Sequence, residues 1–340
     1  MNGSPVLSCR GLTKRFDDVV AVEGFDLEVR AGELMALLGP SGCGKTTALR
    51  LIAGLERPDA GEVWIHDRQV CGGSWVPPER RRVGFVFQDL ALFPHLDVRG
   101  NVAFGLGDEP EGRVDEMLAL ARLEGLEHRM PHELSGGQQQ RVAIARCLAP
   151  SPDLVLLDEP FSNLDRMLRA DVRAEVRELL RAAAVTSVFV THDNEEALSM
   201  ADEVAVMLNG EIRQIGTPFE IYGNPADDEV AELVGEINVL AGVVRSHRAS
   251  SPVGEIPAPG LADGPCRVLV RPESVGIEAD TSGGASVVRI EFFGHDQLIR
   301  CAIEGSGDEV LVRVNGTGPN LAAGDRVRLR LAGPASALPV

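Results

Sequence analysis

The segment that most constrains this chain is the glycine-rich stretch at residues 39–47, GPSGCGKTT. It lies between an apolar run at 34–38 and a run of helix-forming residues at 48–53. A loop of the form G-x-x-x-x-G-K-[ST] between a strand and a helix turns backbone N–H groups inward around phosphate oxygens. An ordinary glycine-rich turn would not need all these positions together with both flanking patterns. The stretch predicts a site for a nucleoside triphosphate, formed by Gly39, Pro40, Ser41, Gly42, Cys43, Gly44, Lys45, Thr46 and Thr47.

A second run supplies the acids that a nucleotide hydrolase needs. Four apolar residues at 154–157 are followed directly by Asp158 and Glu159. In the phosphate loop, Lys45 is expected to reach the β- and γ-phosphates, and the Thr46 hydroxyl is expected to bind Mg²⁺. Asp158 is expected to hold the same ion, and Glu159 to orient or deprotonate the attacking water. A strand that simply ends in two solvated acids is the alternative, and the phosphate loop argues against it.

Composition narrows the classes of protein and ligand. At 340 residues, the chain is long enough for two domains. Its net charge of −18 argues against nucleic acid as the main ligand, because phosphates are neutralised by basic surfaces. No run approaches 18 uninterrupted apolar residues, so a role at a membrane would require a partner protein. The six cysteines lack metal-binding spacing, which predicts free thiols in a reducing cytosol.

Hydrophobic periodicity predicts an α/β fold in the first part of the chain. Short alternating runs within residues 6–30 predict a small antiparallel sheet. Apolar residues at helical spacing within 113–126 predict a helical region that interrupts the main sheet, and 167–183 reads as a long charged helix. Further strands are predicted at 61–65, 83–87, 154–157, 187–190 and 204–207.

The chain changes character near residues 224–238, where Asn-Pro-Ala-Asp-Asp precedes a short predicted helix. We therefore expect two domains, at 1–235 and 236–340. The second is predicted to be a small all-β, barrel-like domain, because short alternating runs are separated by Gly, Pro, Asp and Asn. Its strands are predicted at 266–271, 286–293, 298–303, 310–314 and 327–331.

The octet LSGGQQQR at residues 134–141 points to one family. It resembles the signature of ATP-binding-cassette (ABC) ATPases, and it lies upstream of the acidic strand as in that family. The resemblance implies a P-loop NTPase cassette with a RecA-like core, an antiparallel β subdomain and a helical subdomain. It also implies ATP and Mg²⁺ as ligands, and a homodimer in which this signature contacts the nucleotide of the opposite subunit. The signature residues are Ser135, Gly136, Gly137 and Gln138.

Other family elements follow in the expected order, and the resemblance assigns their roles. It implies that Gln88 contacts Mg²⁺ and the attacking water, and that His192 contacts the γ-phosphate. Asp165, in the tetrapeptide SNLD, is implied to meet the opposite subunit, although Asn163 departs from the usual alanine there. Phe16 stands where the family places an aromatic ring against adenine. The alternative for His192 is a purely structural role, and the alternative for Phe16 is a place in the hydrophobic core.

Three segments resemble importer ATPases for sugars, polyamines, sulfate and iron: 91–98, 101–106 and 216–222. This resemblance implies two membrane-embedded permease subunits, an extracytoplasmic solute-binding protein that acts indirectly, and a peripheral position on the cytoplasmic face of the cell membrane. The segment 270–273, VRPE, resembles part of the oligonucleotide-binding-like (TOBE) tail of those subunits, which serves dimerisation or regulation. No nucleic-acid partner is implied by the name of that fold.

The solute is indicated only by the tail. The segment 291–297, EFFGHDQ, resembles the tails of ferric-iron importer subunits and favours iron(III). Polyamine, quaternary amine, sulfate and sugar stay open. A soluble ABC ATPase clamp acting on ribosomes or DNA is the alternative of another class. Such a clamp predicts two fused cassettes, a long coiled coil or a basic surface, and the sequence contains none of them.

Overall fold

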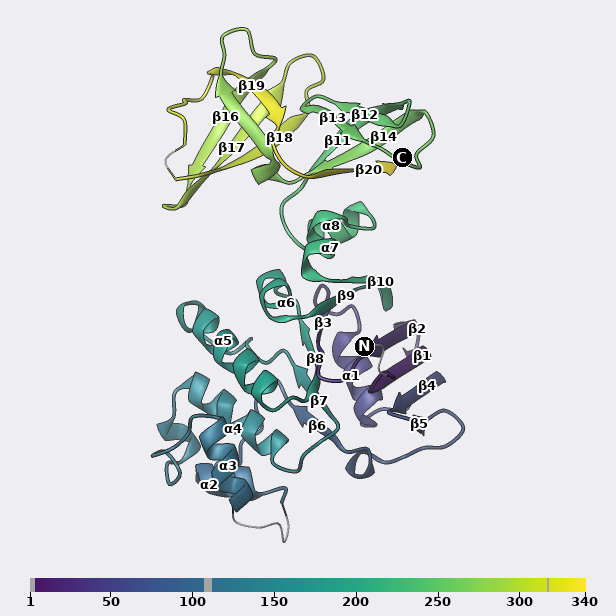
Figure 1. The fold of residues 1–340 in the computed structure, drawn as a ribbon, viewed down its shortest axis with the longest axis vertical. Helices are drawn as coiled ribbons and strands as arrows, with labels where there is room; N and C mark the ends of the chain where they lie inside the picture. Colours follow the sequence, from purple (N-terminus) through teal and green to yellow (C-terminus); the bar gives the residue numbers. More distant parts are fainter. Residues whose placement is uncertain (1–3, 107–111, 317) are drawn as a thin grey trace. The chain divides into compact units, whose positions relative to one another are not determined.

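The computed structural model describes residues 4–106, 112–316 and 318–340 (Figure 1). The chain divides into two compact units, Met1–Pro218 and Phe219–Val340, and each has its own hydrophobic core. The boundary expected at 235/236 lies inside the second unit. The reason is Arg271, which donates hydrogen bonds to the carbonyls of Ala231 and Glu236 and so ties the preceding helical segment to the β-rich tail.

The first unit is built around a six-stranded sheet with the order β10-β9-β3-β8-β7-β6. All strands are parallel except β10, which pairs antiparallel with β9. Strands β3, β7 and β8 are buried along their whole length, as their continuous apolar runs predict. The strands are β3 (Leu34–Leu38), β6 (Val83–Val86), β7 (Leu154–Asp158), β8 (Thr186–Thr191), β9 (Glu203–Leu208) and β10 (Glu211–Gly216).

Helices connect these strands and cover the sheet. Helix α1 packs on β7 and β8, and α6 packs on β3, β8 and α5. Between β6 and β7 the chain forms a helical subdomain, as predicted. The expected helix at 113–126 ends at Leu120, because Arg122 adopts a left-handed backbone conformation with φ 53°. The helices are α1 (Lys45–Ala53), α2 (Val98–Ala103), α3 (Gly112–Leu120), α4 (Gly136–Leu148), α5 (Arg166–Ala182) and α6 (Asn194–Met200).

A four-stranded antiparallel sheet with the order β2-β1-β4-β5 completes the first unit. It confirms the small antiparallel sheet predicted from residues 6–30. Its strands are β1 (Leu7–Phe16), β2 (Val19–Val29), β4 (Ala60–Ile65) and β5 (Arg68–Cys71).

The second unit begins with the short helices α7 (Pro218–Gly223) and α8 (Asp228–Leu233) and is otherwise all-β, as expected. Its strands form two five-stranded antiparallel sheets, β13-β12-β11-β14-β20 and β15-β19-β16-β17-β18. The five predicted strands correspond to β14 (Gly264–Val270), β16 (Ala285–Phe292), β17 (Asp296–Ile303), β18 (Glu309–Asn315) and β19 (Arg326–Leu331). The sequence analysis missed β11 (Asn238–Arg245), β12 (Arg248–Ser251), β13 (Gly254–Pro257), β15 (Val275–Ala279) and β20 (Ala335–Pro339).

All six cysteines are free thiols. Within residues 4–106, 112–316 and 318–340, no helix has the length and apolar character needed to cross a membrane.

Candidate active site

The phosphate loop joins the buried strand β3 to helix α1 and depends on glycine at two close approaches. A Cβ atom on Gly39 would lie 2.2 Å from the carbonyl oxygen of Met207, and one on Gly44 would lie 1.9 Å from that of Ala21. Gly44 also begins the helix with φ 105°, a left-handed conformation that favours glycine. The loop is therefore held against neighbouring backbone on both sides, with the N-terminus of α1 directed at the loop.

Lys45 lies in the concave side of this loop. Its side chain is only 4% exposed, and its Nζ donates hydrogen bonds to the carbonyls of Gly39 at 2.8 Å and Pro40 at 2.9 Å. Cys43 Sγ lies 3.8 Å from the same nitrogen. Burial raises the pKa of the Cys43 thiol, although the Lys45 charge opposes this shift, so Cys43 packs as a small neutral side chain.

Thr46, in the first turn of α1, and Asp158, the last residue of β7, are far apart in sequence but in contact in the structure. Thr46 Oγ1 donates to Asp158 Oδ1 at 2.8 Å. Burial raises the pKa of Asp158, while the bond from Thr46 acts in the opposite direction. Oxygen ligands of this kind fit Mg²⁺, which is usually held by one or two carboxylates together with substrate phosphates. In the described part of the chain, this site included, histidine, cysteine and acidic side chains form no group of three or more that could hold a metal ion.

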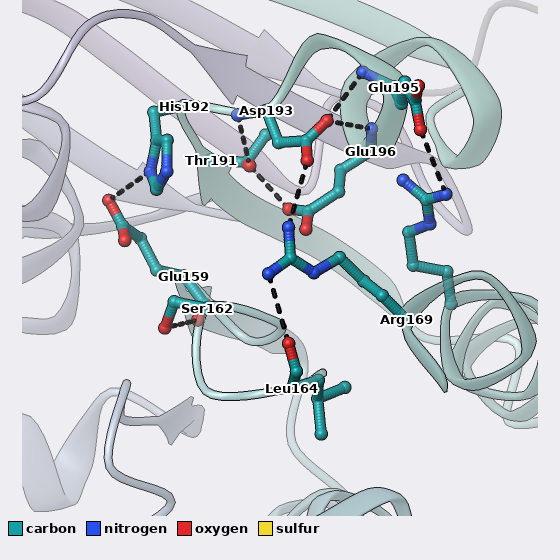
Figure 2. Close-up of polar contacts among 10 residues, drawn as sticks. Glu159, Ser162, Leu164, Arg169, Thr191, His192, Asp193, Glu195 and Glu196 are labelled. Carbon is teal, nitrogen blue, oxygen red and sulfur yellow. Dashed lines mark hydrogen bonds and ion pairs between the residues drawn. The ribbon is translucent and has the colours of Figure 1, made fainter. Parts of the chain in front are cut away.

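Glu159 follows β7, and His192 follows β8, so the parallel sheet brings both to the same edge (Figure 2). Glu159 Oε1 lies 3.2 Å from His192 Nδ1. Glu159 adopts φ 42°, a conformation that costs free energy for a residue with a side chain. Backbone hydrogen bonds hold it there: its N–H donates to Val190, and its carbonyl accepts from the N–H and the hydroxyl of Ser162. The sheet thus fixes the direction of the Glu159 carboxylate.

Three other predicted residues lie at exposed positions. Gln88 follows β6 and is exposed, and its carbonyl accepts a hydrogen bond of 2.8 Å from the Asn163 side chain. Asp165 is exposed and precedes the first residue of α5. Phe16 is 43% exposed, so it lies outside the core, and the Lys14 ammonium lies 5.1 Å from its ring centre.

The signature residues form the start of helix α4. Ser135 caps the helix, with its hydroxyl accepting from Gln138 N and its own N–H donating to Gln138 Oε1. A Cβ atom on Gly136 would lie 2.9 Å from Leu164 Cδ2, and one on Gly137 would lie 2.7 Å from a Val172 methyl carbon. The glycines therefore let α4 approach α5 and the loop that carries Asp165.

A polar network that the sequence does not indicate lies beside His192. From the sequence alone, Glu195 and Glu196 are simply acids in the first turn of a helix, where the dipole favours them. Glu196 is instead buried, at 3% exposure, and accepts a 2.5 Å hydrogen bond from the Thr191 hydroxyl. Asp193 caps α6, and Arg169 reaches it from α5. Asp193 had a sequence signal, because aspartate before a helix is a preferred cap; Arg169 had none.

Replacing Glu196 by glutamine is expected to raise the melting temperature by a few degrees at pH 7. Burial raises the pKa of Glu196, so the folded chain binds protons more tightly than the unfolded chain. This group therefore lowers the free energy of unfolding as the pH rises above 4.5, its ordinary pKa. Glutamine is neutral, and its amide oxygen can still accept from Thr191.

Melting curves between pH 4 and 8 check this expectation. The gain in melting temperature should shrink as the pH falls below 4.5, because the Glu196 carboxyl then becomes protonated in the folded and in the unfolded chain. Glu195→Gln is the control, because Glu195 is 75% exposed on the adjacent position. A loss of stability at pH 7, or a gain that does not change with pH, would contradict the burial argument.

Comparisons with known proteins agree with this geometry. The model of the ABC transporter family matches residues 22–162, and a TOBE domain model matches residues 268–337. The chain is 45% identical to Fe(3+) ions import ATP-binding protein FbpC 1 of Rhodococcus jostii, over 98% of this chain and 99% of that protein. It is 44% identical to the sulfate/thiosulfate import ATP-binding protein CysA of Xanthomonas campestris, over 94% and 95%. It is 51% identical to the spermidine/putrescine import ATP-binding protein PotA of Nitratidesulfovibrio vulgaris, over 71% and 67%.

Two solved structures resemble the cassette. The protein cbiO1 of Clostridium perfringens, part of the ABC transporter complex cbiONQ, matches with a TM-score of 0.59 and 30% identity over 64% of this chain and 91% of that chain. The ATP-binding cassette MJ0796, a dimer in a post-hydrolysis state bound to ADP and Pi, matches with a TM-score of 0.54 and 32% identity over 62% of this chain and 98% of that chain. The chain therefore belongs to the ABC transporter family, as an ATP-hydrolysing subunit of the importer type whose cassette is followed by a TOBE domain.

Proposed function

We propose that this chain energises the import of iron(III) through two permease subunits. The observation that carries the choice of solute is likeness over nearly the whole chain, tail included, to proteins named as Fe(3+) import subunits. The polyamine relatives have higher identity but match a smaller share of the chain. The sulfate relatives are nearly as similar over nearly as much of it, so sulfate is the second candidate.

The residues at the sheet edge have distinct proposed roles in hydrolysis. The N–H groups of the phosphate loop and Lys45 bind the phosphates, and the Phe16 ring stacks on adenine. Thr46, Asp158 and Gln88 would hold Mg²⁺, which when bound would neutralise charge on the phosphate oxygens. Glu159 accepts a proton from the attacking water, and His192 contacts the γ-phosphate.

The active assembly is proposed to be a homodimer that holds ATP between subunits. The first turn of α4 at Ser135–Gln138 offers a second anion-binding helix N-terminus, and one compact cassette cannot easily use both anion sites on one nucleotide. Each signature would therefore contact the nucleotide bound by the partner's phosphate loop. Exposed Asp165 would meet the opposite subunit, and the TOBE domain would stabilise the dimer or receive a regulatory signal.

An aromatic surface in the helical subdomain is the proposed contact for the permease. Phe104 is 60% exposed, and its ring centre lies 4.0 Å from that of Phe93. Phe87, directly after β6, is 39% exposed. The base of this surface is rigid. Asn101 is fully buried and hydrogen-bonded to the Phe93 backbone, and Arg146 lies over the Phe93 ring at 5.0 Å. Such a docked chain would act at the cytoplasmic face of the membrane, with a solute-binding protein on the other side.

Uptake in a strain lacking this gene tests the solute. We expect uptake of radiolabelled iron(III) to be lost, and uptake of sulfate, spermidine and maltose to be retained. The wild-type gene should restore iron uptake, whereas the Glu159→Gln gene at equal abundance should not. Loss of sulfate uptake alone would move the assignment to sulfate. Full uptake of every solute, with the chain recovered on ribosomes, would favour a soluble clamp.

A further inference from the structure

Arg169 bridges two loops that belong to different parts of the active site (Figure 2). It lies in the first turn of α5. Its Nη2 donates a 3.1 Å hydrogen bond to the carbonyl of Leu164, in the loop that carries Asp165. Its Nη1 lies 3.4 Å from Asp193 Oδ2, directly after His192. The planar guanidinium can hold both acceptors at once, which a single ammonium group cannot do with the same geometry.

The Asp193 end of this bridge is fixed by further hydrogen bonds. Asp193 Oδ1 accepts from the N–H groups of Glu195 at 2.9 Å and Glu196 at 3.3 Å. The Asp193 N–H donates to the Thr191 hydroxyl at 2.9 Å. Because His192 stands between these two anchored residues, its backbone cannot shift without breaking this set of contacts. The ring of His192 is in turn 3.2 Å from Glu159.

The Leu164 end of the bridge reaches the signature helix. The Leu164 side chain packs where Gly136 has no side chain, so a Cβ atom there would lie 2.9 Å from it. A continuous path of contacts thus runs from Gly136 through Leu164, Arg169 and Asp193 to His192. Neither end of Arg169 touches the phosphate loop or the predicted Mg²⁺ ligands in these contacts.

We infer that Arg169 is a positioning residue. It couples the Asp165 loop to the His192 loop and thereby fixes the positions of His192 and Glu159 relative to the signature helix. This inference rests on the proposed roles of His192, Glu159 and the signature. It predicts an effect on the rate of hydrolysis and not on the binding of ATP. A displaced catalytic group can cost about 10²-fold in rate even when the altered residue is remote from the chemistry.

The test compares Arg169→Met with Arg173→Met in the full chain. Arg173 lies one helical turn further along α5 and pairs with Glu195 at 3.6 Å, so it matches Arg169 in chemistry and in its contact with α6. We expect Arg169→Met to lower kcat for ATP about 10-fold or more with KM for ATP unchanged. Arg173→Met should leave both within about twofold. The melting temperatures of the two variants should be similar.

A second variant separates coupling from folding. Asp193→Asn removes the charge that pairs with Arg169 but retains a good helix cap. It should lower kcat as Arg169→Met does, and the double variant should lower it no further, because both changes remove the same contact. Additive losses, a parallel rise in KM, or equal effects of Arg169→Met and Arg173→Met would overturn the inference. Glu159→Gln is the reference variant. If it retains turnover, the site assignment and this inference both fail. If it is inactive while Arg169→Met has normal turnover, only this inference fails.

Discussion

Replacing Glu159 by glutamine lowers the rate of ATP hydrolysis by at least about 10²-fold and leaves ATP binding intact, because a general base contributes about 10²–10⁴-fold. Glutamine has nearly the same shape and can adopt the same backbone conformation, which contacts with Val190 and Ser162 hold in place. Its amide cannot accept the proton of the attacking water. Phosphate release under saturating ATP measures the rate, and equilibrium binding of labelled ATP with Mg²⁺ measures the affinity.

Glu195→Gln is the matched control for this experiment. Glu195 is also a glutamate near His192, but it is exposed and pairs with Arg173. We expect its turnover to be close to that of the wild type. Near-normal turnover of Glu159→Gln would remove Glu159 from its proposed role. A loss of ATP binding in that variant would instead show that Glu159 holds the nucleotide.

The local parts of the site could be predicted from the sequence because each is a short contiguous pattern. The phosphate loop, the acidic end of β7 and the capped start of α4 each contain the residues that define them. Their strand or helix context follows from adjacent apolar runs such as 34–38 and 154–157. The ABC resemblance then supplied the order of these elements, and the comparisons confirm that the chain belongs to the ABC family.

Contacts between distant segments could not be predicted in this way. Arg169 and Asp193 are separated by 24 residues, and Asn163 and Gln88 by 75, so only the packing of α5 and the parallel sheet brings them together. In the sequence, Glu196 indicated only an acid in the N-terminal turn of a helix, because its burial depends on the same packing. Asn163 stands where the family usually has alanine. Its side chain hydrogen-bonds to the Gln88 carbonyl and so connects the loop after β7 to the loop after β6.

In the second unit, too, several strands could not be predicted from the sequence. Strands β12 and β13 contain serine, glycine and proline, which weaken the strand pattern, and β20 pairs with a strand far away in sequence. The motif at 270–273 indicated a family tail but not the function of its arginine. Arg271 is buried, stacks on Tyr222 at 4.1 Å and donates to the carbonyls of Tyr222, Ala231, Gly235 and Glu236. This anchoring places α7, except its first residue Pro218, in the second unit.

Heterodimers that carry the same two lesions in different arrangements test whether ATP is shared between subunits. Lys45→Met removes the cation of the phosphate loop. Ser135→Asp retains a good helix cap but places a negative charge where the phosphate of the partner's nucleotide is expected. All chains also carry Glu159→Gln, so that bound ATP is not consumed. Chains with two different affinity tags allow heterodimers to be purified and their retained ATP to be counted.

The arrangement of the lesions decides the expected result. With Lys45→Met on one chain and Ser135→Asp on the other, a shared site leaves one composite site intact and places both lesions in the second. That heterodimer should retain one ATP. With both lesions on one chain, each composite site carries one lesion, and affinity at both should fall by at least about 10-fold. If each cassette instead binds ATP through its own phosphate loop alone, each heterodimer has one chain with an intact Lys45, and both arrangements retain one ATP. Both heterodimers carry the same two lesions, so equal counts of retained ATP would contradict a shared site, and a higher count with the lesions on different chains supports it.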